Sequence, residues 1–173
     1  MDTLDASSLR ELQAPLKQRY RSDPTTAHTP VHARGDFRAR GITCSVEGWA
    51  GTVRAGLHRA TGGDGSDACS ADMLLEALLA CAGVTLRSVA TAMGLTLRSA
   101  SLRADGAFDV RGTLGVDRSV PVGVQDIVVT VEVDTDADDA SLERLAGATE
   151  RYCVVGQTLR DNPRFVVRRA TGT

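Results

Sequence analysis

The sequence contains no uninterrupted run of 18 apolar residues, the length that a membrane-spanning helix requires. Its longest apolar run, 73–82, is interrupted by Glu76, so we expect no membrane association. The amino-terminal residues MDTLDASSLRELQ contain two acids in the first five positions and no apolar stretch, which argues against a secretory signal. We therefore expect a cytoplasmic protein.

A strong excess of charge of one sign is also missing. The 20 basic and 22 acidic residues give a net charge of −2, and Lys17 is the only lysine. A nearly neutral chain has no general electrostatic attraction to nucleic acid or to an anionic membrane, so we expect neither as a partner. The 173 residues, 42% of them hydrophobic, are typical of a globular domain with a real core.

Residues 1–30 are predicted to form a helical extension and a linker. Ser8 and Glu11 match a capping box, leucines follow on one side, and Pro15 is expected to limit the helix. The polar segment 22–30 contains two prolines, as expected between an added helix and a main domain. The main domain is therefore assigned to residues 31–173.

The main domain shows two helices among short strands. The first helix is predicted from an N-cap at Ser70 to a C′ residue at Gly94, and eleven of the fourteen residues 73–86 are apolar, so this helix must be central. The second follows the acidic turn 134–139 and includes Cys153 at helical spacing. Strands are predicted at 42–46, 51–57, 95–97, 100–104, 108–111, 127–133 and 164–168, with a tight hairpin at Asp105-Gly106. This order predicts an α+β fold with antiparallel sheets.

The four cysteines, Cys44, Cys69, Cys81 and Cys153, are not expected to form structural disulfides in the reducing cytosol. Cys81 lies in the middle of the first helix, with Thr85 and Ser88 on its face, and Cys153 lies on the inner stripe of the second helix. If these helices pack together, the two thiols have the arrangement of a redox pair. A buried cysteine is also commonly a small apolar core residue.

Other cysteine chemistries are less well supported. A zinc site from His58, Cys69, Cys81 and Cys153 lacks the close ligand pairs that such sites use, so we expect no metal. The three histidines, His28, His32 and His58, show no spacing that assigns a base to a cysteine hydrolase. The glycine-rich segment 60–66 lacks the GK[ST] ending of a phosphate-binding loop, so we expect a flexible loop there. The sequence has no C-x-x-C motif, which argues against a thiol–disulfide oxidoreductase.

The segment 70–83, SADMLLEALLACAG, resembles the helix of the OsmC/Ohr family that carries the reactive cysteine, and 150–155, ERYCVV, resembles its second-cysteine segment. The resemblance extends from about Val31 to Val167. It implies an OsmC-like fold of two intertwined subunits, with two long central helices and the active site at the dimer interface. The implied activity is thiol-dependent reduction of organic hydroperoxides, without a metal or an organic cofactor.

The resemblance also implies residue roles. Cys81 would attack the peroxide, Cys153 would resolve the sulfenic acid as a disulfide, and an external dithiol would reduce that disulfide. A cation must favour the Cys81 thiolate, and the family uses an arginine from the amino-terminal strands, for which Arg38 or Arg40 is the candidate here.

This sequence differs from the family pattern at the start of the cysteine helix. The glutamate common ten positions before the reactive cysteine is replaced by Ala71, with Asp72 beside it as an auxiliary candidate. Cys69 is an additional cysteine and an alternative disulfide partner. The missing glutamate motivates a second hypothesis, in which the protein keeps the OsmC fold but binds a small molecule with little or no peroxidase activity.

Overall fold

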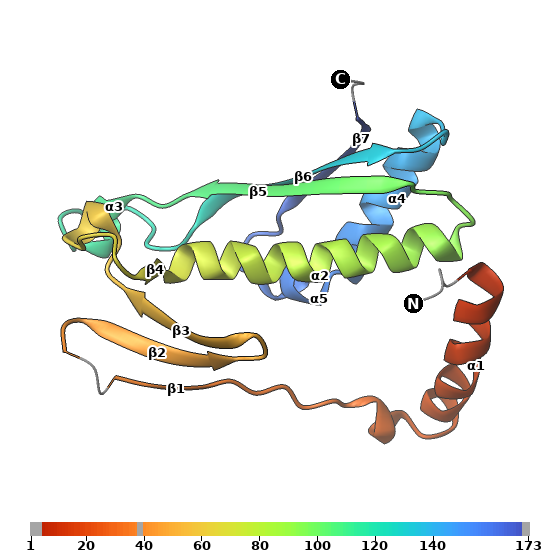
Figure 1. The fold of residues 1–173 in the computed structure, drawn as a ribbon, viewed down its shortest axis with the longest axis horizontal. Helices are drawn as coiled ribbons and strands as arrows, with labels where there is room; N and C mark the ends of the chain where they lie inside the picture. Colours follow the sequence, from red (N-terminus) through yellow and green to blue (C-terminus); the bar gives the residue numbers. More distant parts are fainter. Residues whose placement is uncertain (1–4, 38–39, 171–173) are drawn as a thin grey trace. The chain divides into compact units, whose positions relative to one another are not determined.

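The computed structural model describes residues 5–37 and 40–170. The chain forms two compact units. Unit 1 contains Met1–Pro30, Leu78–Ala104 and Val128–Thr173, and unit 2 contains Val31–Ala77 and Asp105–Ile127. Three elements, α2 (Ser70–Ala92), β5 (Ser99–Ala107) and β6 (Gln125–Asp134), continue from one unit into the other (Figure 1).

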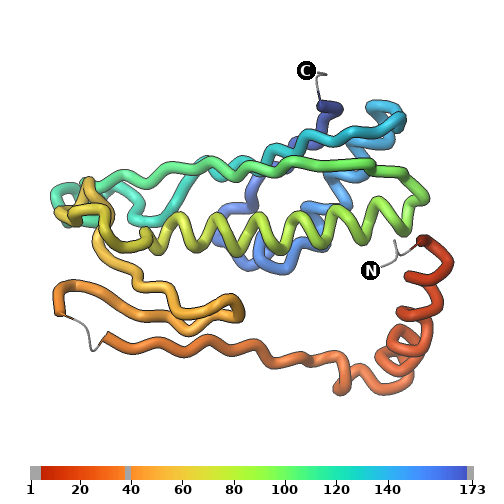
Figure 2. The backbone as a smooth tube through the Cα atoms, in the orientation of Figure 1, coloured from red at the N-terminus to blue at the C-terminus, as the bar shows by residue number. Residues whose placement is uncertain are grey.

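Unit 2 is built on a four-stranded sheet in the order β1-β2-β3-β4. The strands are β1 (Arg34–Asp36), β2 (Thr43–Gly48), β3 (Gly51–Gly56) and β4 (Ala68–Cys69). β1 and β3 are antiparallel to β2, whereas β4 is parallel to β3. The β2–β3 hairpin, orange in Figure 2, turns through Gly51, whose φ of 129° suits glycine. Two short helices complete the unit, η2 (Arg59–Thr61) and α3 (Val110–Thr113).

Unit 1 surrounds a core between helices and a three-stranded sheet in the order β5-β6-β7, with β7 at Arg164–Arg169. Alternate β6 residues Val129, Val131 and Val133 are fully buried, as expected for a strand with one face on a core. α2 runs beneath β5 in Figure 1 and contributes a buried residue every fourth position, Leu78, Ala82, Leu86 and Ala90. Leu102 of β5 lies against Gly83 of α2.

The helices α4 (Asp139–Tyr152) and α5 (Val154–Thr158) connect β6 to β7. α4 begins at its N-cap Asp138, which accepts the Ser141 N–H, and buries Leu142, Leu145 and Thr149. Because a helical connection returns the chain to the same end of the sheet, β7 is parallel to β6. The α+β class is confirmed, but both sheets are mixed rather than antiparallel.

The amino-terminal helix differs from its predicted form. α1 (Ala6–Ser22) starts at Asp5, whose carboxylate accepts the Ser8 N–H at 2.8 Å, so Ser8 is not the cap. Pro15 lies inside the helix and does not end it. No residue of α1 is buried. A short helix, η1 (Pro24–Ala27), follows in the proline-containing segment.

Three local predictions between residues 95 and 111 are wrong. Asp105 and Gly106 lie inside β5 rather than in a hairpin, and 95–97 form no strand. The predicted strand 108–111 is replaced by the start of α3, because the Asp109 carboxylate accepts the Arg111 N–H and caps a helical turn. Local side-chain capping therefore overrode the β-branched pattern. Gly94, by contrast, has the positive φ (70°) of a residue that follows a helix.

Within the described residues, one helix, α2, is long and apolar enough to cross a bilayer by length and composition. The sequence criterion of an uninterrupted apolar run missed it because Glu76 and Arg87 are spread along 23 residues. Central helices of soluble proteins pass the same test, so this property alone does not indicate a membrane protein.

Candidate active site at Cys81 and Cys153

Cys81 is placed by the long helix α2. Its neighbours Leu78 and Ala82 are fully buried in the core of unit 1, whereas Ala80 and Val84 are exposed. Cys81 lies between these two sides and is partly accessible. The helix therefore holds the thiol at the boundary of the core, where a solvent molecule or a small substrate can reach it.

Cys153 lies at the break between α4 and α5. Its backbone N–H donates to the Thr149 carbonyl oxygen at 2.9 Å and ends α4, while its own ψ of 102° is not helical. Its Sγ then accepts the Gly156 N–H at 3.4 Å and caps α5. The prediction that Cys153 lies within the second helix is therefore wrong by one residue, and Cys153 is the junction itself.

α5 packs against α2 at Gly156. A Cβ atom at this position would lie 3.4 Å from the Cys153 Sγ and 3.6 Å from Cδ1 of Leu78. Leu78 precedes Cys81 by one helical turn, so the first turn of α5 packs beside the segment of α2 that carries the thiol. This packing brings the two sulfur-bearing positions together, although 72 positions separate them in the sequence.

The surroundings of Cys81 favour its thiolate. Burial raises the pKa of this thiol, but hydrogen bonds from the Val155 N–H, the Cys153 thiol, the Thr85 hydroxyl and the Val154 N–H lower it, and the net pKa is lower than usual. The two backbone donors are the free N–H groups at the start of α5. A thiolate at Cys81 thus has several hydrogen-bond donors.

Cys153 is affected in the opposite direction. Burial raises the pKa of its thiol, the Gly156 N–H opposes this, and the hydrogen bond to Cys81 and the charge of Cys81 raise the pKa further. The net pKa is higher than usual. When one proton is lost from the pair, Cys81 therefore becomes the thiolate and Cys153 keeps its proton and donates a hydrogen bond.

Cys81 and Cys153 lie in unit 1. Of the other predicted site residues, Arg38 lies outside the described residues. Arg40, Asp72 and Cys69 belong to unit 2, where Arg40 and Asp72 are exposed and Cys69 is partly accessible. None of the groups that act on the pKa of Cys81 in the described part of the chain is a guanidinium. Nor do the described residues include a cluster of three side chains able to hold a metal.

Sequence reasoning placed Thr85 on the face of Cys81 but missed the residues after Cys153. Val154 and Val155 act through their backbone N–H groups, which no side-chain pattern reveals.

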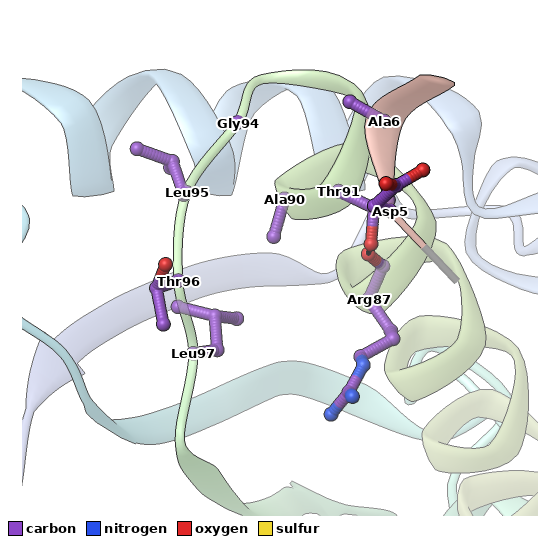
Figure 3. Close-up of a pocket in the computed structure, with 9 residues that line it drawn as sticks. All are labelled: Asp5, Ala6, Arg87, Ala90, Thr91, Gly94, Leu95, Thr96 and Leu97. Carbon is purple, nitrogen blue, oxygen red and sulfur yellow. Dashed lines mark hydrogen bonds between the residues drawn. The ribbon is translucent and has the colours of Figure 1, made fainter. Parts of the chain in front are cut away.

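A separate cavity of about 330 Å³ lies at the C-terminal end of α2 in unit 1 (Figure 3). Its wall combines an acid, Asp5 at the start of α1, with a cation, Arg87 of α2, and the segment 94–97. Neither Cys81 nor Cys153 lines it, so this cavity is distinct from the pair of thiols.

Comparison with known proteins identifies the family. The model of the OsmC-like protein family matches residues 63–168, which include both Cys81 and Cys153. The chain belongs to the OsmC-like family. No curated protein matches it.

Solved structures share the fold at low sequence identity. An OsmC-like protein from Mycoplasma pneumoniae is 14% identical, with a TM-score of 0.65 over 82% of this chain and 99% of that one. An organic hydroperoxide resistance protein OsmC from Legionella pneumophila is 16% identical, with a TM-score of 0.63 over 83% and 100%. The organic hydroperoxide resistance protein OhrB of Bacillus subtilis is 14% identical, with a TM-score of 0.56 over 81% and 98%. These similarities establish the OsmC-like fold.

Proposed function

We propose that the protein is a thiol-dependent peroxidase that reduces organic hydroperoxides, with Cys81 as the attacking thiol and Cys153 as the resolving thiol. The observation that carries this proposal is the packing of the Cys153 junction beside the turn of α2 that leads to Cys81, with the interaction of the two thiols lowering the pKa of Cys81 and raising that of Cys153. Such a pair has one nucleophile and one protonated partner. The names of the Legionella pneumophila and Bacillus subtilis proteins support the substrate class.

In the first step the Cys81 thiolate attacks the distal oxygen of the hydroperoxide. An S–O bond forms, the O–O bond breaks, and the departing alkoxide takes a proton from solvent to become the alcohol, so the sulfur is oxidised to a sulfenic acid and the peroxide is reduced. In the second step the Cys153 thiol attacks that sulfur, water leaves, and a Cys81–Cys153 disulfide forms. An external dithiol then reduces the disulfide in two exchange steps.

The donors around Cys81 serve the first step. The N–H groups of Val154 and Val155 and the hydroxyl of Thr85 stabilise the thiolate before attack. We assign the additional cation to Arg38 or Arg40 and an auxiliary role to Asp72, as the family resemblance implies. Neither a metal nor an organic cofactor takes part in this scheme. The apolar surroundings of Cys81 favour bulky organic peroxides over hydrogen peroxide.

We further propose that the protein works in the cytoplasm as an intertwined homodimer. The α2 face opposite the core of unit 1 leaves Val84 73% exposed, an unusual state for the middle of so apolar a helix. A second subunit would cover this face. Light scattering after size-exclusion chromatography should give twice the mass of 18.2 kDa, and an active monomer would contradict the assembly.

The second candidate function is that of a binding protein with the same fold and little peroxidase activity. Two observations favour it: Ala71 occupies the position of the family's glutamate, and no described guanidinium acts on the pKa of Cys81. Such a protein would hold a small apolar or sulfur-containing ligand beside Cys81 without turning over peroxide.

Steady-state turnover separates the two functions. With cumene hydroperoxide and excess dithiothreitol, a peroxidase consumes many equivalents of peroxide per Cys81, at a rate proportional to protein concentration. A binding protein consumes at most one equivalent before it stops. The exposed Cys44 provides the control, because Cys44→Ser should leave the rate unchanged if the pair in unit 1 carries the reaction.

A further inference from the structure

Unit 2 contains a cavity of about 420 Å³ that the peroxidase scheme does not use. Three parts of the sequence enclose it: the end of β3 with η2, the junction of β4 and α2, and α3 with residues 122–124. All of its lining residues belong to unit 2. Its volume lies in the range of small-molecule sites, roughly 300 to 1,000 Å³.

The lining of this cavity carries no carboxylate, lysine or arginine. Leu57, Leu74, Phe108, Val122 and Val124 supply apolar walls. The polar side chains are a few hydroxyls, the thiol of Cys69 and the imidazole of His58. An ionic ligand would find no opposite charge on this lining, so the lining favours uncharged molecules.

His58 can donate a hydrogen bond into the cavity from its Nε2 atom. Its Nδ1 accepts the Ala60 N–H at 3.1 Å, so in the neutral ring the hydrogen is on Nε2. Among the described residues no group accepts a hydrogen bond from Nε2. The ring also stands edge-on to Phe108, with centroids 5.5 Å apart and planes at 79°. The Ala60 N–H and the Phe108 ring thus both contact the His58 ring.

Two glycines near His58 lie against neighbouring atoms too closely to accept a side chain. A Cβ atom at Gly63 would lie 1.7 Å from the Leu57 carbonyl oxygen, and one at Gly56 would lie 2.8 Å from the Asp67 side chain. Asp67 is itself ion-paired with Arg54 of β3, and the pairing of Gly56 with Cys69 fixes β4 beside β3. These contacts fix the backbone on this side of the cavity, which lowers the entropy cost of binding.

We propose that this cavity binds a compact uncharged molecule with an aromatic or branched apolar body and one hydrogen-bond acceptor, such as a carbonyl oxygen, that receives the Nε2–H of His58. The site is separate from the chemistry of Cys81 and needs no oxidant. Phe108 and the aliphatic side chains pack against the body of the ligand, and His58 fixes its orientation. Cys69 borders the ligand and reports its presence.

Protection of Cys69 from alkylation tests the proposal on the full chain. Acetophenone is a suitable probe, because it combines an aromatic ring with one carbonyl oxygen and no charge. We expect it to slow the alkylation of Cys69 by N-ethylmaleimide, measured peptide by peptide in a mass spectrometer. The exposed Cys44 on β2 lies outside the lining and should react at an unchanged rate. Benzoate should give no protection.

Variants identify the donor and the cavity. His58→Asn keeps an acceptor for the Ala60 N–H, and His58→Phe keeps an aromatic ring, but both remove the Nε2–H. Each should weaken protection by acetophenone about three- to tenfold, the value of one hydrogen bond. Cumene, which has no acceptor, should protect equally in wild type and in the His58→Phe variant. Val122→Trp should abolish protection by filling the cavity, and the exposed His32→Asn serves as the matched control.

The proposal is overturned if acetophenone gives no protection of Cys69 at millimolar concentration, if it protects Cys44 as well, or if both His58 variants bind it as wild type does. Stronger protection by benzoate would overturn the uncharged ligand class. Cys81→Ser should leave all these results unchanged, so a failure of the peroxidase proposal and a failure of this one are seen separately.

Discussion

Cys81 in unit 1 and Cys69 in unit 2 are twelve positions apart in the sequence, yet their surroundings differ in what governs thiol chemistry. Two backbone N–H groups, a hydroxyl and a second thiol lower the pKa of Cys81. Cys69 borders an uncharged, largely apolar cavity. The comparison teaches that the α4–α5 break, rather than the cysteine helix, creates the reactive position, because it supplies free N–H donors and the partner thiol together.

Exchange of each thiol for a hydroxyl gives the largest expected difference between the two regions. Cys81→Ser should lower cumene hydroperoxide turnover by at least about a thousandfold, because a serine hydroxyl is not ionised at neutral pH and cannot form a sulfenic acid. Cys69→Ser should change the rate less than about twofold. Circular dichroism should show both variants folded, since the substitution is nearly isosteric. Retained turnover in Cys81→Ser would contradict the assignment of Cys81 as the attacking thiol.

The disulfide formed after one equivalent of hydroperoxide distinguishes the two candidate partners. We expect a Cys81–Cys153 linkage in the peptide map and, in Cys153→Ser, further oxidation of Cys81 to sulfinic acid with loss of multiple turnovers. α2 is continuous from Ser70, so the Cα atoms of Cys69 and Cys81 in one chain are about 16 to 18 Å apart. A disulfide requires Cα atoms within roughly 7 Å. A Cys69–Cys81 linkage as the main product would make Cys69, rather than Cys153, the resolving thiol.

The pH dependence of the first step gives a smaller, graded effect. Because the pKa of Cys81 is lowered, the rate of reaction with hydroperoxide should rise with pH and level off at a lower pH than for free cysteine. Thr85→Val removes a donor that favours the thiolate, so its midpoint should move to higher pH. Ser88→Ala on the same helix is the control. Stopped-flow measurement with excess hydroperoxide checks this, and an unmoved midpoint in Thr85→Val would exclude that hydroxyl as a donor.

The smallest expected effect concerns the stability of the segment that places Cys153. Thr149 is fully buried, and its hydroxyl donates to the Leu145 carbonyl oxygen at 2.7 Å. Thr149→Val should lower the free energy of unfolding by about 1 kcal/mol or less, because one neutral hydrogen bond is lost and a methyl group is buried instead. Thr158 of α5 makes the same bond, to Val154, but is exposed. In urea unfolding, the midpoint should fall more for Thr149→Val than for Thr158→Val. Equal midpoints for the two variants would contradict this prediction.

Elements with long apolar patterns were predicted correctly from the sequence, and several elements with short patterns were not. The helix at Ser70–Ala92 and the strand at 127–133 were predicted because long apolar patterns leave little choice of structure. The elements at 95–111 were predicted wrongly, since there a single capping carboxylate, Asp109, decides between a strand and a helical turn. The contact of Cys81 with Cys153 was predicted only on the condition that their helices pack together.

The sequence by itself determined the class of the fold, the central apolar helix and the two cysteines that the family resemblance singles out. It did so because apolar periodicity and rare reactive residues are properties of a linear chain. The tertiary structure alone decided that α4 ends at Cys153 and that α5 begins there. The periodic pattern of α4 continues through Cys153, so no local preference marks the break. The packing of α5 beside Leu78 places the free N–H groups of Val154 and Val155 near Cys81, and backbone donors have no signature in a sequence.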